Sequence, residues 1–172
     1  MHHRSVREPT FQDLRVLPKV SISRADSSHR RQLRTLLIEA HIGHSGTVRI
    51  NEILVATSRG KILGCAGLEM VGCSAIVHSV AVRKESRRRG VGMRLIRECM
   101  SAARKQGAIL VALTTMFWNV GFFRKCGFET LSRRALPSAL QVHKAFCAAK
   151  YRYTTPMIAT FRVSQETISL DD

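Results

Sequence analysis

The sequence predicts an α+β (α/β) fold built on a mixed, twisted β-sheet of about six to seven strands. Residues 52–58, 61–69 and 73–82 are apolar, β-branched runs joined by short turns, which is typical of an antiparallel meander. A basic loop and a helical pattern over 91–103 follow the third run. The next run, 108–114, is almost continuously apolar, which indicates a buried strand parallel to the one before the helix.

One domain accounts for most of the chain. Its 172 residues, 45% of them hydrophobic, suffice for a single core. We expect a flexible basic arm over residues 1–17, the domain over 18–163 and a loose tail over 164–172. No apolar run approaches the ~20 residues that span a bilayer, and the amino terminus lacks the apolar region of a signal peptide. These features predict a cytoplasmic protein without membrane contact.

The first part of the chain predicts a strand over 20–24 and then an amphipathic helix. The polar residues 26–28 are candidate N-caps of this helix. Residues 41–51, which contain two glycines, are expected to hold only a turn or two of helix. The first two strands of the meander meet at a tight Arg59-Gly60 turn.

The second part predicts a long helix that ends at Gly107, a residue suited to a left-handed C-terminal position. A short helix starts at Thr115, and Phe128–Arg133 is the next predicted strand. A small helical connection begins at Ala135, and Thr154–Val163 is the closing strand.

The five cysteines lack a Cys-x-x-Cys pair and fall in predicted strands and helices: Cys65, Cys73, Cys99, Cys126 and Cys147. This pattern favours reduced thiols packed in the core. The histidines and cysteines show no zinc-binding spacing, so we expect no metal.

The stretch from Ser79 to Cys99 carries the strongest functional signal. A helix N-terminus leaves backbone N–H groups unpaired and carries partial positive charge. Gly90 and Gly92 have no side chains there, so an anion can reach those N–H groups. Three neighbouring arginines add charged, forked donors suited to phosphate oxygens: Arg87, Arg88 and Arg89. The stretch predicts a pyrophosphate site; the alternative is a solvated arginine run beside a helix cap.

The spacing excludes two familiar phosphate-binding loops. A P-loop requires Gly-x-x-x-x-Gly-Lys-Ser/Thr, and a dinucleotide fingerprint requires a third glycine near Leu95; the chain has neither. The motif Arg87-x-x-Gly90-x-Gly92, directly after a strand ending Val80-Ala81-Val82, resembles the acyl-CoA signature of the GNAT N-acetyltransferase superfamily. The predicted order of elements over about residues 21–161 is also similar to that family.

The resemblance implies a GNAT fold, with helices on both faces of the sheet and a V-shaped split between its two central parallel strands. This split admits the pantetheine arm of acetyl-CoA. The resemblance places the coenzyme on the strand end, the loop, the helix start and one later phenylalanine: Val80, Ala81, Val82, Arg87, Arg88, Arg89, Gly90, Val91, Gly92, Met93 and Phe123. A backbone N–H within 80–82, freed by the split, is the expected oxyanion donor.

Four segments resemble the arsenic-resistance N-acetyltransferase-like and N-acetylglutamate-synthase-like branch of that superfamily: 64–69, 113–115, 122–128 and 135–137. Many superfamily members carry a tyrosine acid where this chain has Phe123, and the branch that this chain resembles also lacks that tyrosine. Tyr151 and Tyr153, near the last strand, are alternative acids. Branch members usually carry an arginine, suited to a substrate carboxylate, where this chain has His78. A carboxylate-bearing acceptor is therefore in doubt.

Acyl transfer to a primary amine requires a proton acceptor, because the amine is mostly protonated at neutral pH. His78 is the first candidate, since imidazole titrates near pH ~6.5; the alternative is a core histidine bonded to backbone. Glu69 either guides the amine or, as is more common, solvates a hairpin end. Thr114 and Thr115 are expected to bind substrate or to cap the next helix. Phe122, Phe123 and Trp118 are expected in the core or on the cofactor wall rather than on a base-stacking platform.

Two functions follow from these observations. The first is an acetyl-CoA-dependent N-acetyltransferase that acetylates a primary amine by direct attack, with a small amino-acid-like acceptor or, alternatively, a protein. The second is a GNAT-like basic module that binds nucleic acid or the ribosome, motivated by the net charge of +16. The charge also predicts weak contact with nucleic acid or acidic proteins, and the resemblance leaves a homodimer open.

Overall fold

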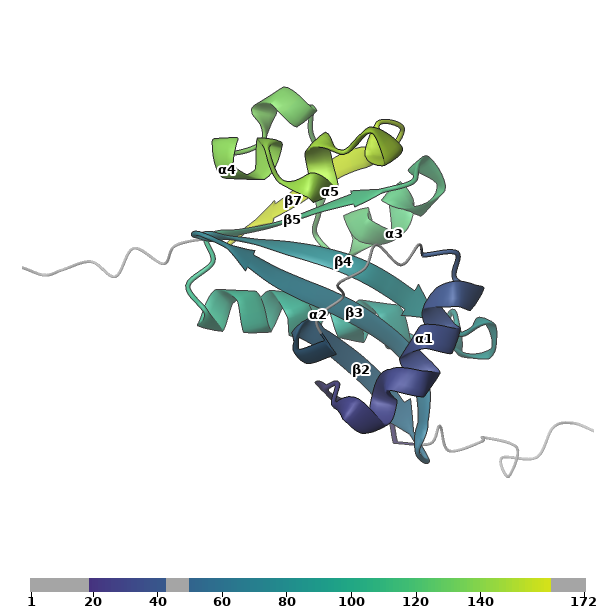
Figure 1. The fold of residues 1–172 in the computed structure, drawn as a ribbon. Coiled ribbons are helices and arrows are strands. Elements are labelled where there is room, and N and C mark those ends of the chain that lie inside the picture. Colours follow the sequence, from purple (N-terminus) through teal and green to yellow (C-terminus); the bar gives the residue numbers. More distant parts are fainter. Residues whose placement is uncertain (1–18, 43–49, 162–172) are drawn as a thin grey trace, which may run out of the picture.

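Seven strands form one mixed sheet in a computed structural model that describes residues 19–42 and 50–161 (Figure 1). The order across the sheet is β1-β2-β3-β4-β5-β7-β6. The strands are β1 (Ser21–Arg24), β2 (Ile53–Ser58), β3 (Lys61–Val71), β4 (Ser74–Val82), β5 (Leu110–Thr115), β6 (Glu129–Thr130) and β7 (Thr155–Thr160). Neighbouring strands are antiparallel except for the parallel pair β4 and β5. The predicted fold class is confirmed.

Helices cover both faces of this sheet, as Figure 1 shows. The helices are α1 (Arg30–Glu39), α2 (Val91–Lys105), α3 (Val120–Lys125), α4 (Ser138–Gln141) and α5 (Lys144–Cys147). Side chains of a strand alternate between the two faces. Leu95 of α2 therefore packs in one cluster with Ala66 and Leu68, whereas Leu36 of α1 packs with Cys65 on the opposite face. The C-terminal helices α4 and α5 pack on the α1 face, against Ile76 and Ala112.

The predicted helix ends and the predicted hairpin turn agree closely with the structure. The Asp26 carboxylate accepts a 2.9 Å hydrogen bond from the Ser28 N–H and so caps the 3-10 turn Ser27–His29 before α1. Gly107 has a φ of +85° just after α2, and its N–H donates to the Arg104 carbonyl. The Arg59-Gly60 turn has positive φ at both residues, as a two-residue hairpin requires.

Two strand boundaries were predicted wrongly. β3 extends beyond Glu69 to Val71, so Glu69 does not end its strand. The predicted strand Phe128–Arg133 is reduced to Glu129–Thr130, because Arg133 begins a 3-10 turn. The helix expected over 41–51 falls mostly on residues outside the described part of the chain, as do the arm 1–17, the tail 164–172 and the end of the closing strand.

The thiols divide into buried and exposed groups. Cys65 and Cys99 are fully buried, and burial raises the pKa of each thiol to about 12. Cys73 and Cys147 are exposed, so the prediction that all five thiols pack in the core is wrong for these two. Within residues 19–42 and 50–161, no helix is long and apolar enough to cross a bilayer.

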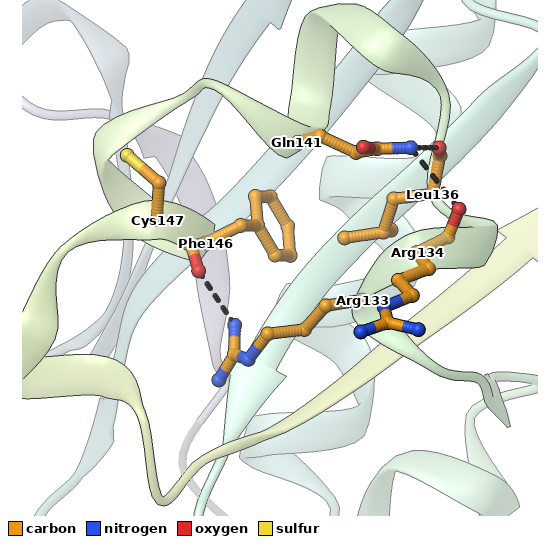
Figure 2. Close-up of a pocket in the computed structure, with 6 residues that line it drawn as sticks. All are labelled: Arg133, Arg134, Leu136, Gln141, Phe146 and Cys147. Atoms are coloured by element: carbon orange, nitrogen blue, oxygen red, sulfur yellow. Dashed lines mark hydrogen bonds between the residues drawn. The ribbon is translucent and has the colours of Figure 1, made fainter.

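One arginine holds the C-terminal segment together. The Arg133 guanidinium donates to the carbonyl of Phe146 at 2.8 Å, to that of Thr154 at 2.8 Å and to that of Tyr151. Figure 2 shows this side chain beside a pocket of about 260 Å³ in which Phe146 and Leu136 face each other. The same guanidinium donates to Thr154 Oγ1 at 3.0 Å. Arg133 therefore joins α5, the following turn and the start of β7 into one unit.

We expect Arg133→Ala to lower the free energy of unfolding by about 2–4 kcal/mol, because several carbonyls lose a charged donor at once. Chemical denaturation measures this change, and limited proteolysis tests whether residues 142–154 become accessible. Arg134→Ala is the matched control, since Arg134 is the exposed neighbour in sequence. Equal stability of the two variants would contradict the role given to Arg133.

Candidate functional site

The two central strands separate after a short shared stretch. β4 and β5 pair only at Ser74–Leu110, Ala75–Val111 and Ile76–Ala112. Beyond this point β4 stays paired with β3, and β5 stays paired with β7 up to Thr115. The sheet is therefore open between residues 77–82 of β4 and 113–115 of β5.

Backbone N–H groups of β4 face this opening. The N–H of Arg83 donates to the Leu63 carbonyl on the β3 side at 2.8 Å. Because successive N–H groups of a strand point to opposite sides, those of Val82 and Val80 point away from β3. A bulge precedes them: β4 has one extra residue between His78 and Ala81, and Ser79 adopts a φ of +51°. The opening thus exposes potential donors along one strand edge.

The start of α2 lies at the end of the same strand edge. Gly90 is the N-cap residue with a φ of +76°, and the first helical bond runs from the Arg94 N–H to its carbonyl at 3.0 Å. The N–H groups of Val91, Gly92 and Met93 therefore have no acceptor within the helix. A Cβ on Gly90 would meet no atom within 4 Å, so these donors are open to an anion.

A single cleft of about 1810 Å³ joins the opening to this helix start. Fourteen of the fifteen predicted site residues line it: Glu69, His78, Val80, Ala81, Val82, Arg87, Arg88, Gly90, Val91, Gly92, Met93, Thr114, Thr115 and Phe123. Arg89 is exposed and does not line the cleft. The Arg87 guanidinium donates through Nε to the Val82 carbonyl at 3.0 Å, which ties the loop to the strand. The cleft is not the 260 Å³ pocket of Figure 2, which lies at the C-terminal segment.

His78 lies in a slot that a glycine provides. Gly67 is its partner in register on β3, and a Cβ on Gly67 would lie 2.2 Å from His78 Cε1. The imidazole is hydrogen-bonded through Nδ1 to Ser79 Oγ at 3.0 Å. Burial lowers the pKa of His78 below its ordinary value, while the nearby Glu69 carboxylate acts in the opposite direction. The ring is therefore held mainly neutral beside the cleft at neutral pH.

Glu69 has a partner that the sequence did not indicate. His143, in the N-cap position of α5, accepts from the Ala145 N–H through Nδ1 at 3.2 Å. Its Nε2 therefore carries the proton and donates to Glu69 Oε1 at 3.3 Å. The Glu69 side chain is 31% exposed and the His143 side chain 15%. A contact across 74 residues of sequence thus fixes a carboxylate on the cleft wall.

The two threonines predicted to contact substrate differ in their surroundings. Thr115 is buried as the last residue of β5. The Thr114 hydroxyl donates to Thr154 Oγ1 at 2.6 Å, and Thr154 in turn donates to the Tyr151 carbonyl at 2.7 Å. Thr114 is thus linked to the segment that Arg133 organises. Tyr151 lines the cleft, whereas Tyr153 is 74% exposed and does not.

Positive charge predominates around the cleft. Six basic side chains line it, against Glu52 and Glu69 alone among the acids of the described residues: Arg24, Arg87, Arg88, Lys125, Lys144 and Lys150. Such a lining attracts anionic ligands and raises their rate of encounter. Within the described residues, no group of three or more histidines, cysteines or acids is close enough to hold a metal ion.

The chain was compared with families of known proteins and with solved structures. Residues 49–130 match the family model described as acetyltransferase (GNAT) domain. This central part of the chain is therefore similar to a GNAT acetyltransferase domain. An uncharacterised N-acetyltransferase of Chlorobaculum tepidum is 26% identical over 92 residues, which are 53% of this chain. The match spans 58% of that relative's length.

Solved structures share the fold of this chain. N-acetylglutamate synthase from Neisseria gonorrhoeae, solved with coenzyme A and N-acetyl-glutamate, superposes with a TM-score of 0.74 at 21% identity. The superposition covers 86% of this chain and 36% of the synthase. Rv2747 from Mycobacterium tuberculosis, solved with CoA and NLQ, gives 0.71 at 16% identity and covers 83% of this chain and 99% of that one. At these identities the likeness establishes the fold.

We expect Gly67→Ala to displace the His78 imidazole, because the new methyl group would overlap it. Such overpacking costs about 1–3 kcal/mol of the free energy of unfolding. Chemical denaturation and the NMR chemical shifts of the His78 ring protons measure both effects. The control is Gly121→Ala in α3, where a Cβ meets nothing within 4 Å and alanine is expected to be neutral or stabilising. Unchanged His78 shifts in Gly67→Ala would show that the ring does not occupy this slot.

Proposed function

We propose that this chain is a GNAT-type, acetyl-CoA-dependent N-acetyltransferase that acetylates a primary amine by direct attack. The observation that carries the proposal is the continuity of the opened β4 edge with the glycine-flanked start of α2 inside one cleft. The synthase and Rv2747 structures, both solved with coenzyme A, support this choice of cofactor.

The start of α2 fits a pyrophosphate. Its three N–H groups have no helical acceptor, the space beyond Gly90 is open, and the exposed guanidinium groups of Arg87 and Arg88 stand on the same loop. Oriented N–H groups and forked cations are the donors that phosphate oxygens prefer. We therefore assign residues 87–93 to the phosphates of coenzyme A, with Arg89 as a more distant charge.

The opened edge of β4 fits an extended arm. The N–H groups of Val80 and Val82 provide donors to an amide or a carbonyl lying along the strand. Phe123 is 6% exposed and lines the cleft from α3, so it offers an apolar wall. An N–H of this edge is also suited to stabilise negative charge on a carbonyl oxygen.

His78 is the proposed proton acceptor for the amine. If its Nδ1–H donates to Ser79 Oγ, the Nε2 lone pair is free to accept a proton. Acetyl-CoA supplies an activated acetyl thioester; the amine nitrogen bonds to the acetyl carbon, the C–S bond breaks, and coenzyme A leaves as thiolate. The ammonium form of the acceptor gives one proton to His78 before attack. The second proton, which the nitrogen loses as the amide forms, passes to the coenzyme A thiolate.

Glu69 and Thr114 complete the acceptor half of the cleft in this proposal. The carboxylate, held by His143, attracts an ammonium group, and Thr114 offers a hydroxyl on the opposite strand. An amino-acid-like amine suits this set of groups. The gonococcal synthase was solved with N-acetyl-glutamate, which supports an acetylated amine of this class, although His78 replaces the arginine suited to a substrate carboxylate.

Gly90→Glu is expected to weaken coenzyme A binding by more than about 100-fold, because the added carboxylate occupies the space in front of the helix start and repels phosphate. Isothermal titration calorimetry measures the loss. Gly60→Glu is the matched control: it adds the same charge at another left-handed glycine (φ +72°) with open space, in the β2–β3 turn. It carries the same backbone strain and leaves coenzyme A binding unchanged.

Absence of coenzyme A binding by the unmodified protein would refute the proposal. If the protein also releases no thiol from acetyl-CoA with any amine of a panel, yet binds RNA with a steep salt dependence, the basic binding module becomes the better explanation.

The acid limb of the pH–rate profile is expected below pH 6.5. A general base acts in its deprotonated form, and burial lowers the pKa of His78, so activity rises as the pH passes upward through that lowered value. Thiol release with the most active amine of the panel measures the profile. His78→Gln is expected to remove this limb and lower kcat/KM by roughly 10²–10⁴-fold. His29→Gln, outside the cleft, keeps the limb; a limb that persists in His78→Gln assigns the base elsewhere.

A further inference from the structure

Two aromatic side chains stand exposed where β5 ends. Phe117 is 74% exposed and Trp118 is 63% exposed, with ring centroids 4.9 Å apart at an interplanar angle of 77°. Of the two places expected for Trp118, the core is therefore wrong, and its position is on the wall of the cleft. Trp118 lines the same cleft as Gly90 and Gly92. Large aromatic groups contribute most when buried, so this exposure indicates a surface that a ligand covers.

The aromatic pair is tied to the start of α2 through α3. Phe117–Asn119 form a 3-10 turn that leads directly into α3. In α3, Phe122 Cζ lies 3.2 Å from the point where a Cβ would stand on Gly92. Residues four apart on a helical surface are neighbours, with Cβ atoms about 5–6 Å apart. Trp118 therefore lies about one turn from the residue that contacts the helix start.

The cations that line the same cleft as Trp118 favour a nucleotide as its ligand. Arg88 lines the cleft from the loop before α2, and Lys125 lines it from the end of α3. Both side chains belong to exposed residues. A cleft that holds both a flat aromatic ring and cations suits a base with attached phosphates better than an alkyl chain, which would gain nothing from the cations.

We propose that Trp118 is the stacking platform for the adenine base of coenzyme A. This inference rests on the proposed function, which places the pyrophosphate of the same molecule on the start of α2. The pantetheine arm then runs inward along β4, and the adenosine runs outward to Trp118. The aromatic ring distinguishes the whole coenzyme from its adenine-free fragment.

Trp118 is the single tryptophan of the chain, so intrinsic fluorescence reports on this residue directly. The probes are coenzyme A, adenosine 3′,5′-bisphosphate and 4′-phosphopantetheine. We expect the first two to quench tryptophan fluorescence and 4′-phosphopantetheine, which has no base, to leave it unchanged. Calorimetry is expected to show that Trp118→Ala weakens coenzyme A binding by about tenfold, the loss of one stacked base. The affinity for 4′-phosphopantetheine is expected to stay the same.

Matched variants separate stacking from a structural effect. Trp118→Phe retains an aromatic face and is expected to recover most of the coenzyme A affinity. Tyr153→Ala removes another aromatic ring, 74% exposed and outside the cleft, and is expected to bind coenzyme A as the unmodified protein does.

The outcomes distinguish this inference from the proposed function. Coenzyme A binding by calorimetry with unchanged fluorescence, or with equal affinity in Trp118→Ala, overturns the inference and leaves the proposed function standing. Absence of coenzyme A binding overturns both. Quenching by a short RNA oligonucleotide but not by coenzyme A overturns the inference in favour of a nucleic-acid contact.

Discussion

The loss of β5 as a hydrogen-bond neighbour of β4 after Ile76 is the constraint on which the site depends. Backbone N–H groups require acceptors, and a strand inside a sheet normally finds them on both sides. β4 finds them on the β3 side, but on the other side its N–H groups meet a cleft. The bulge at Ser79 occurs in this unpaired stretch, where it adds local twist.

The C-terminal segment, which contains α4, α5 and β7, forms another wall of the cleft. β7 pairs with β5 along its whole length, while α4 and α5 pack on Ile76 and Ala112. Arg133 joins this segment by bonds to three carbonyls, and Thr154 connects it to Thr114. His143 then reaches Glu69 from the same segment. The part of the cleft beside Glu69 and Thr114 is therefore shaped by residues far apart in sequence.

Sequence reasoning succeeded where the signal is local. The spacing of Val91, Leu95 and Cys99 predicted which face of α2 is buried, because helix periodicity alone determines that face. Gly90 and Gly92 marked the helix start, since only residues without a side chain leave its N–H groups open. The coenzyme residues expected from the family resemblance line the cleft, except Arg89.

Sequence reasoning failed where the structure depends on long-range contacts. Nothing near Arg133 reveals that its guanidinium turns inward, so its segment was predicted as a strand. The pairing of His143 with Glu69 depends on how α5 docks, which no local pattern encodes. The slot under His78 could have been suspected from Gly67 only with the strand register in hand. The exposure of Trp118 depends on how the turn after β5 sits against α3.

The short seam between β4 and β5 has a thermodynamic consequence. Three residue pairs join a half-sheet of β1–β4 to a half-sheet of β5–β7, and the cleft separates the two beyond that seam. A ligand bound in the cleft contacts both half-sheets and therefore stabilises their association. Since such a molecule binds only the assembled domain, its binding free energy adds to the resistance of the whole domain to melting. The melting temperature of this protein should therefore rise with the fraction of its cleft that is occupied by ligand.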